Sequence, residues 1–278
     1  MTSIERLLAK GCVRDSITLH EAFQGLPDMA HGGSVLAAFD VIACRRGLSG
    51  PREIFGAYRR KVPLSTPLPL EAPNSGTRAE FRLSDGQQLL AEGWVGPAVL
   101  PSERIDLAGN LRGGFPLPIS TRCFACGTQN PFGLRVTLKF DEERVWTEHL
   151  PPEPFRTDDG YLSTAALTTL LDEAAFWLGA LATGESGMTT ELRVILHRTP
   201  INFGEPLIAL GWRKRAVPRA GDARYQETEA TVLSREGDLL ASARITFVAV
   251  KGAARRLVTG ILNVNPPEIL RRVFPAYT

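Results

Sequence analysis

Two apolar, alanine-rich segments decide how this chain folds: HGGSVLAAFDVIAC at residues 31–44 and STAALTTLLDEAAF at residues 163–176. Each segment predicts a helix that is apolar around most of its circumference, and such a helix is buried on most sides. Aligning Asp40 with Asp172 also aligns the first residues of the two segments, which indicates an internal repeat. We therefore expect two related halves, each built around one buried helix.

The segments that follow the two helices also match. Residues 53–61 and 189–198 each predict a strand, and a proline-bounded turn leads from each into a further strand. Each half then closes with a predicted hairpin, whose turns lie at residues 84–86 and 235–238. We therefore expect an α+β fold with two antiparallel β-sheets, each wrapping a long central α-helix, related by a pseudo-twofold axis.

Length and composition agree with two halves. The chain has 278 residues, 44% of them hydrophobic, which suits two soluble domains better than one. We expect an N-terminal domain at 1–100, a linker at 101–122, a C-terminal domain at 123–252 and a tail at 253–278. Some local structure is expected within the linker at 102–111, and a short helix within the tail at 268–274.

Charge and cysteine content exclude several classes of protein. With 32 basic and 30 acidic residues the chain has no overall basic field, so nucleic acid is not expected as a partner. The apolar runs look too short to cross a bilayer and the N-terminus lacks a signal-peptide core, so no membrane association is expected. Four cysteines do not make a disulfide framework in a chain of this length, which favours a cytoplasmic protein.

A motif at the start of the first helix resembles a known family. The sequence FQGLPDMAHGG at residues 23–33, with a carboxylate at Asp40 further along the helix, is similar to the hotdog-fold thioesterases. The second half carries LLDEA at residues 170–174, preceded by CFACG at 123–127 and NPFGL at 130–134, as in the lead-in of many hotdog domains. The resemblance covers nearly the whole chain and implies a double hotdog. It implies an acyl-CoA thioesterase without metal or redox cofactor, in which coenzyme A is only part of the substrate.

Thioester hydrolysis needs donors for the carbonyl oxygen and a base that activates water. Gly32 and Gly33, which follow His31, can supply backbone N–H groups that have no acceptor within the helix. A carboxylate in an apolar helix is a candidate base. Asp172 is the first candidate, and Glu173 beside it is expected to face solvent or a strand edge.

Distance along the helix decides which of these groups can act together. Gly33 and Asp40 are separated by roughly 10 Å along one helix axis, so one carbonyl group cannot contact both. The site must therefore combine the His-Gly-Gly turn of the first helix with Asp172 or Glu173 of the second, packed antiparallel beside it. The opposite combination joins Asp40, the alternative catalyst, to residues 163–165, which lack the histidine and both glycines. We expect one active and one degenerate site.

Other residues are candidates for substrate contacts. Thr168 and Thr169 lie about one turn before Asp172 and could position water, although packing as small polar residues is the favoured explanation. Basic residues at strand ends could receive the phosphates of coenzyme A, or could simply be solvated. They are Arg59, Arg60, Lys61 and Arg213.

Cys123 and Cys126 form a CxxC pair. Zinc would need two more ligands at suitable spacing, and none lies nearby in the sequence, so we expect local packing and no metal site.

Two other functions stay open. An enoyl-thioester hydratase or dehydratase on the same fold needs a histidine and a carboxylate at the substrate, which His31 and Asp172 could supply. A non-catalytic acyl-CoA-binding protein would also explain the loss of one site. In each case the partner is an acyl-CoA or an acyl-carrier-protein thioester. Since hotdog sheets commonly associate, we also expect a homo-oligomer, a dimer of double hotdogs.

Overall fold

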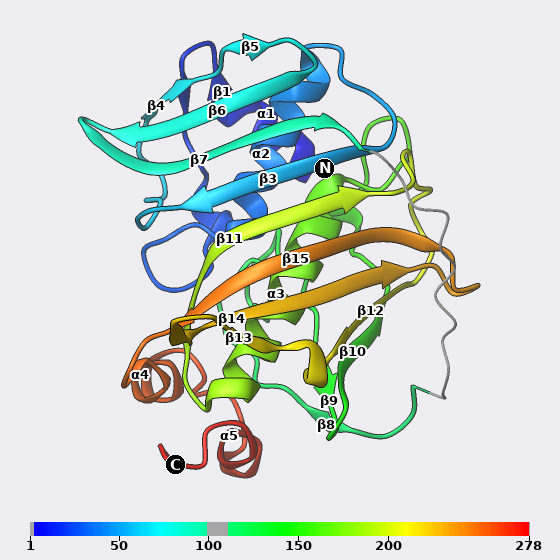
Figure 1. Ribbon diagram of the computed structural model, residues 1–278. Helices are drawn as coiled ribbons and strands as arrows, with labels where there is room; N and C mark the ends of the chain where they lie inside the picture. Colours follow the sequence, from blue (N-terminus) through cyan, green and yellow to red (C-terminus); the bar gives the residue numbers. More distant parts are fainter. Residues whose placement is uncertain (1–2, 99–110, 278) are drawn as a thin grey trace.

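Two long helices lie on one side of a single large antiparallel sheet (Figure 1). The computed structural model describes residues 3–98 and 111–277. The helices are α2 (Gly32–Arg45) and α3 (Thr164–Thr183), and they confirm the two helices predicted from the repeat. The N-cap of α2 is His31, and the N-cap of α3 is Ser163, so the aligned residues have the same structural role.

The sheet has the strand order β1-β2-β4-β6-β7-β3-β11-β15-β14-β12-β10-β9-β8, with β5 and β13 attached to β6 and β14. The strands of the first half are β1 (Cys12–Val13), β2 (Ser16–Ile17), β3 (Arg52–Tyr58), β4 (Leu68–Glu71), β5 (Asn74–Ser75), β6 (Arg78–Asp85) and β7 (Gln88–Pro97). Those of the second are β8 (Phe115–Pro116), β9 (Lys139–Phe140), β10 (Arg144–His149), β11 (Gly187–Leu196), β12 (Leu207–Trp212), β13 (Val217–Arg219), β14 (Asp222–Leu233) and β15 (Leu239–Ala249). Both predicted hairpins are present, as β6–β7 and β14–β15.

The expectation of two separate sheets is wrong. Strand β3 of the first half pairs with β11 of the second, with Arg52 opposite Leu196 and Ala57 opposite Glu191. An edge strand presents unpaired N–H and C=O groups, and here each half satisfies those of the other. The two halves therefore share one sheet as well as a helix–helix contact.

The two central helices run antiparallel. The hydroxyl of Thr168 lies 2.8 Å from the Gly33 carbonyl oxygen, near the start of α2. The hydroxyl of Thr164, one turn earlier on α3, lies 2.7 Å from Asp40, further along α2. The first turn of each helix therefore lies beside the carboxylate-bearing middle of the other helix, as the distance along the helix axis required.

Helix α3 is long and apolar enough to span a membrane by length and composition, contrary to the expectation from the apolar runs. Of that apolar window, however, 83% is buried inside the protein. The sheet wraps around α3, so the helix owes its apolar surface to its place in the core (Figure 1).

Shorter elements complete the fold. They are α1 (Ile4–Gly11), α4 (Ala253–Gly260), α5 (Pro267–Val273) and the 3-10 turns η1 (Glu21–Phe23), η2 (Glu153–Phe155) and η3 (Arg213–Arg215). Helix α5 confirms the short helix predicted in the tail, and buried Leu257 and Phe274 anchor the tail to the core. Part of the predicted linker, β8, pairs with β9, whereas residues 101–110 of it lie outside the described residues. The domain boundaries stay a prediction.

Candidate active site

The segment before α2 places His31 at the N-terminus of the helix. The His31 N–H donates to the carbonyl of Phe23 at 2.8 Å, and the neighbouring Ala30 N–H donates to Val62 at 2.8 Å. These bonds fix an extended residue at position 31, with φ −66° and ψ 134°, as an N-cap requires. The imidazole is therefore buried at the helix start, with its Nδ1 atom 3.2 Å from the Gly33 nitrogen.

Asp172 reaches the same point from the middle of α3. Its Oδ2 atom accepts the Gly33 N–H at 2.9 Å and lies 3.1 Å from His31 Nδ1. Its Oδ1 atom accepts the hydroxyl of Thr189, on β11, at 2.7 Å. The structure thus brings together the groups that the composite-site prediction combined, and the Gly33 N–H itself holds the carboxylate.

Glycine is needed at positions 32 and 33 because the two helices approach so closely. A Cβ atom on Gly33 would lie 2.5 Å from the Thr168 carbonyl oxygen and 2.7 Å from the Thr169 Cα atom. A Cβ atom on Gly32 would lie 2.8 Å from Asp172 Oδ2. The glycines therefore permit the helix crossing that places the carboxylate beside the start of α2.

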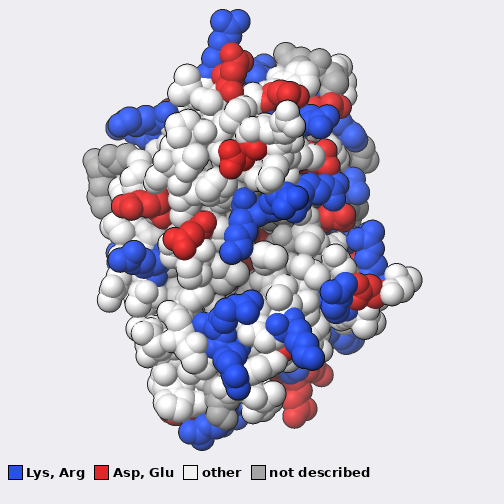
Figure 2. Space-filling view, turned by 90° about the vertical axis from the view of Figure 1, so that its left-hand side faces the viewer, with Lys and Arg blue, Asp and Glu red and all other residues white. Residues whose placement is uncertain are grey.

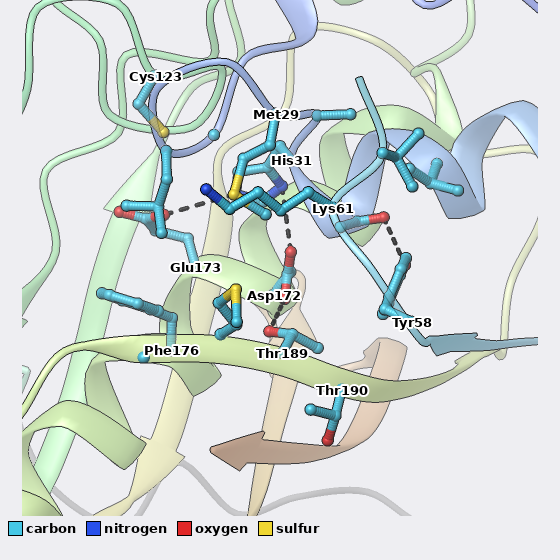
Figure 3. Close-up of a pocket in the computed structure, with 18 of the residues that line it drawn as sticks. Met29, His31, Tyr58, Lys61, Cys123, Asp172, Glu173, Phe176, Thr189 and Thr190 are labelled. Atoms are coloured by element: carbon cyan, nitrogen blue, oxygen red, sulfur yellow. Dashed lines mark hydrogen bonds and ion pairs between the residues drawn. The ribbon is translucent and has the colours of Figure 1, made fainter. Parts of the chain in front are cut away.

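The His31 imidazole lies between two carboxylates (Figure 3). Its Nε2 atom is 3.6 Å from Glu173 Oε2, on the side opposite Asp172. Burial alone would lower the pKa of His31, but the charges of Asp172 and Glu173 outweigh it and raise the pKa to about 9. The imidazole is therefore protonated at neutral pH, and both ring nitrogens can donate.

The expectation that Glu173 faces solvent or a strand edge is wrong. Its side chain is buried, and its Oε1 atom accepts the indole N–H of Trp177 at 3.0 Å. The CxxC loop lies beside it, because the Phe124 N–H donates to the Gln24 carbonyl at 2.6 Å and docks the loop against the segment before α2.

Both cysteines of the loop are buried. A hydrogen bond from Cys126 lowers the pKa of the Cys123 thiol, against the effect of burial.

Two residues of the site were missed by the sequence analysis. Tyr58, at the end of β3, donates its hydroxyl to the Gly32 carbonyl at 2.7 Å. Burial, and next the charge of Asp172, raise the pKa of Tyr58 well above its usual value, so the hydroxyl stays a donor. Thr189 is the second. Both lie at strand ends, but nothing in the local sequence indicates that those ends face α2 and α3.

A cavity of about 200 Å³ opens beside these groups. His31, Gly32, Tyr58, Asp172 and Glu173 line its polar part. Apolar side chains line much of the remainder, among them Met29, Val35, Phe176, Trp177, Leu257 and Ile261. The cavity therefore joins a set of charged groups to an apolar space.

The basic residues that were expected to contact the phosphates of coenzyme A lie in two different places. Arg59, Arg60 and Lys61 follow β3 and line the cavity, and Arg59 pairs with Glu92 at 2.8 Å. They lie on the face where β3 ends and β11 begins, and Lys and Arg residues gather on this face (Figure 2). Arg213 does not line the cavity, and its guanidinium donates to the Asp141 carbonyl instead.

Thr168 and Thr169 also lie away from the cavity lining. Thr168 joins the two helices through its bond to the Gly33 carbonyl, which agrees with the packing interpretation. The hydroxyl of Thr169 is buried and has no hydrogen-bond partner among the described residues.

The symmetry-related site around Asp40 is chemically different. Arg52 donates to both oxygens of the Asp40 carboxylate, and Thr164 donates to Oδ2 at 2.7 Å. Both partners of this ion pair are buried, with Asp40 1% and Arg52 6% exposed. The position of His31 is taken by Ser163, so the carboxylate that corresponds to Asp172 faces an arginine instead of a histidine and a glycine N–H.

Comparison with known proteins identifies the fold. The chain matches no family model and no curated protein. Among solved structures it is similar to a conserved protein of unknown function with a hot dog fold from Alicyclobacillus acidocaldarius, with a TM-score of 0.58 and 14% identity over 84% of this chain and 92% of that one. This chain has the hotdog fold.

Two other solved structures that are similar in fold have names that give different activities. An acyl-CoA thioesterase II from Mycobacterium marinum is similar with a TM-score of 0.57 and 14% identity, over 89% of this chain and 98% of that one. A dehydratase domain of a trans-AT polyketide synthase from Brevibacillus brevis is similar with a TM-score of 0.57 and 13% identity, over 85% and 92%. Similarity in fold therefore does not distinguish a thioesterase from a dehydratase.

Proposed function

We propose that this protein is a thioester hydrolase, an acyl-CoA thioesterase, and that its two halves form a double hotdog with one active site. The observation that carries the proposal is the convergence of Asp172 from one half on the His31–Gly33 turn of the other, beside a partly apolar cavity. Similarity in fold to thioesterase II proteins supports it.

Asp172 is the proposed base. Its carboxylate is held at both oxygens, by Gly33 and by Thr189, so it is oriented before the substrate binds. Water attacks the thioester carbonyl carbon and gives a proton to this carboxylate. His31 fixes the carboxylate through Nδ1 and is a positioning residue.

The carbonyl oxygen of the substrate requires donors as it becomes negative. The Gly32 N–H is the first of α2 and has no acceptor within the helix, and Gly32 lines the cavity. We assign the oxyanion contact to this N–H rather than to the Gly33 N–H, which already donates to Asp172. When the tetrahedral intermediate collapses, the carbon–sulfur bond breaks and coenzyme A leaves as a thiolate, which is a good leaving group because the pKa of a thiol is only about 8.5.

The cavity suggests how the substrate is held. Phe176, Trp177 and the other apolar side chains suit an acyl chain, and the cations that follow β3 suit the phosphates of coenzyme A. A carrier-protein thioester would offer the same reacting group with a different surface. A cytoplasmic location and a dimer of double hotdogs belong to this proposal as well.

The test is release of free thiol from a panel of acyl-CoAs by the wild type, Asp172→Asn and Asp40→Asn. Asn preserves the shape and the acceptor for Gly33, so Asp172→Asn is expected to fold normally and to lower kcat/KM by about 10²–10⁴-fold through loss of the base. Asp40→Asn is expected to keep most of its activity per folded molecule. Equal losses in the two variants, or a loss only in Asp40→Asn, would refute the one-site proposal.

The same assay distinguishes the alternative reactions. His31 and Asp172 lie 3.1 Å apart, which is also an arrangement that a dehydratase or hydratase could use. Loss of enoyl absorbance without thiol release would favour that activity. Saturable binding without turnover of any thioester would favour a non-catalytic acyl-CoA-binding protein.

A further inference from the structure

A second cluster of reactive groups lies on the far side of the His31 ring from Asp172. His31, Cys123 and Glu173 each present one potential metal ligand, and the three ligand atoms lie within 4.8 Å of one another. All three residues are buried and line the cavity (Figure 3). The hydrolysis described above does not use Cys123 or the Nε2 atom of His31.

We propose that His31 Nε2, Cys123 Sγ and Glu173 Oε2 bind a zinc ion, which displaces the Nε2 proton of His31 and the thiol proton of Cys123 into solvent. Zinc bonds to nitrogen, sulfur and carboxylate oxygen are about 2.0–2.3 Å long, so a tetrahedral site separates its ligand atoms by about 3.3–3.6 Å. The observed separation of His31 Nε2 and Glu173 Oε2 is 3.6 Å. The His31 and Glu173 atoms therefore already have the spacing that the ion requires, and Cys123 Sγ lies within 4.8 Å of both. All three ligand types are ones that zinc accepts.

The outer contacts of two ligands favour the same assignment. A histidine that binds zinc usually donates its other ring N–H to a carboxylate, which fixes the ring, and His31 Nδ1 lies 3.1 Å from Asp172 Oδ2. Glu173 is fixed in the same way, because its Oε1 atom accepts the Trp177 N–H at 3.0 Å. These contacts occupy His31 Nδ1 and Glu173 Oε1, so His31 Nε2 and Glu173 Oε2 are the atoms available to the ion.

Cys126, the other cysteine of the CxxC pair, is not one of the three clustered ligands and supports the site through hydrogen bonds. The Cys126 thiol hydrogen-bonds with Cys123 and Glu173, and lies 3.8 Å from the Ser120 hydroxyl. Three protein ligands leave the fourth position of zinc to an oxygen atom from the cavity, which is the arrangement of catalytic zinc sites. A thioester carbonyl or a water could occupy it, and zinc there would polarise that group.

The proposal overturns the reason for expecting no metal. No further ligand lies near the CxxC pair in the sequence, because His31 and Glu173 are far from it along the chain. Docking of the CxxC loop against residue 24, and of α3 against α2, brings them together. Zinc binding does not depend on the reaction that the site performs.

Metal content is the direct test. The full-length protein, purified under reducing conditions and dialysed against zinc and then against zinc-free buffer, is expected to retain one zinc per chain by elemental analysis. Cobalt(II) added to the metal-free protein is expected to give a thiolate charge-transfer band in the near ultraviolet. Cys123→Ser should abolish the band, and Glu173→Gln should weaken zinc affinity by at least 10-fold. Asp172→Asn, which alters only an outer contact, is expected to weaken it by about 10–100-fold.

The matched control is Cys44→Ser, because Cys44 is an exposed thiol outside this cavity. It should bind zinc and cobalt as the wild type does, and circular dichroism should confirm that every variant is folded. Protein that retains no stoichiometric zinc with its thiols reduced, or a folded Cys123→Ser that binds zinc like the wild type, would overturn the proposal. A zinc-loaded protein that releases no thiol from any thioester would refute the proposed function and leave the zinc site intact.

Discussion

Gly33→Ala tests the helix contact on which the proposed active site depends. The added Cβ atom would lie 2.5 Å from the Thr168 carbonyl oxygen and 2.7 Å from the Thr169 Cα atom, whereas ordinary contacts are 3.4–4 Å. Both obstacles are backbone, so a side-chain rotation cannot relieve them. The two helices must separate by about 1 Å, which is the difference between these distances.

Two consequences of different size follow from that separation. Overpacking of a dense interior costs about 1–3 kcal/mol, which corresponds to a fall in Tm of about 2–5 °C for a chain of this size. The bond of 2.9 Å between Gly33 and Asp172 would lengthen by a similar distance. Since a displacement of about 1 Å in a catalytic group can cost about 10²-fold in rate, kcat is expected to fall by about 100-fold while the protein stays folded.

Thermal unfolding and thiol release measure the two effects separately. Gly260→Ala is the matched control, because an added Cβ atom there meets nothing within 4 Å and the backbone is not left-handed. It should leave both Tm and kcat close to the wild-type values. If Gly33→Ala behaved in the same way as this control, the close approach of the helices would not position Asp172, and the reasoning would be refuted.

Three further predictions concern the surroundings of the site. Arg52→Met leaves the buried Asp40 carboxylate without its cation and should lower the free energy of unfolding by about 3–5 kcal/mol. A loss below about 1 kcal/mol in urea denaturation would contradict this, and the double variant with Asp40→Asn should recover most of it. Thr189→Val removes the 2.7 Å bond to Asp172 and should lower kcat by about 10-fold or more with little change in KM, so a change confined to KM would argue against a positioning role. Partial burial of Glu185 opposes its ionisation, but hydrogen bonds from Tyr277 and from backbone N–H groups outweigh this and lower its pKa below 4.5. Its contribution to stability is therefore present above pH 4.5 and is lost as the pH falls through the folded-state pKa. Stability measured against pH should therefore be flatter in the acid range for Glu185→Gln, and an unchanged curve would show that these bonds do not favour the ionised form.

The two halves show how a fused repeat can diverge. Each central helix carries an aspartate, but Asp172 meets a histidine and a glycine N–H, whereas Asp40 meets a buried arginine. The Arg52 guanidinium, which cannot lose its proton, binds both oxygens of Asp40, and Asp40 does not line the cavity beside His31. Two separate chains of identical sequence could not make this division, because each substitution would appear at both sites.

Local sequence was sufficient for the two central helices and the two hairpins. The periodicity of residues 31–44 and 163–176, and the turns between the strands, predicted both central helices and both hairpins, since these features depend on residues close together in the chain. The rise of an α-helix was sufficient to show that the glycine turn cannot act with Asp40 and must combine with a carboxylate of the other helix, Asp172 or Glu173. The pairing in the structure agrees with that arithmetic.

Tertiary structure alone decided the rest. The pairing of β3 with β11, the inward orientation of Glu173, and the contact of the CxxC loop with His31 all join residues that are distant in the chain. Such contacts depend on how whole elements pack, and a single sequence carries no local pattern that specifies them. For the same reason the sequence indicated an aspartate and a glycine turn as separate features. Only the packed helices show why glycine is needed there, because a Cβ atom at position 32 or 33 would collide with α3.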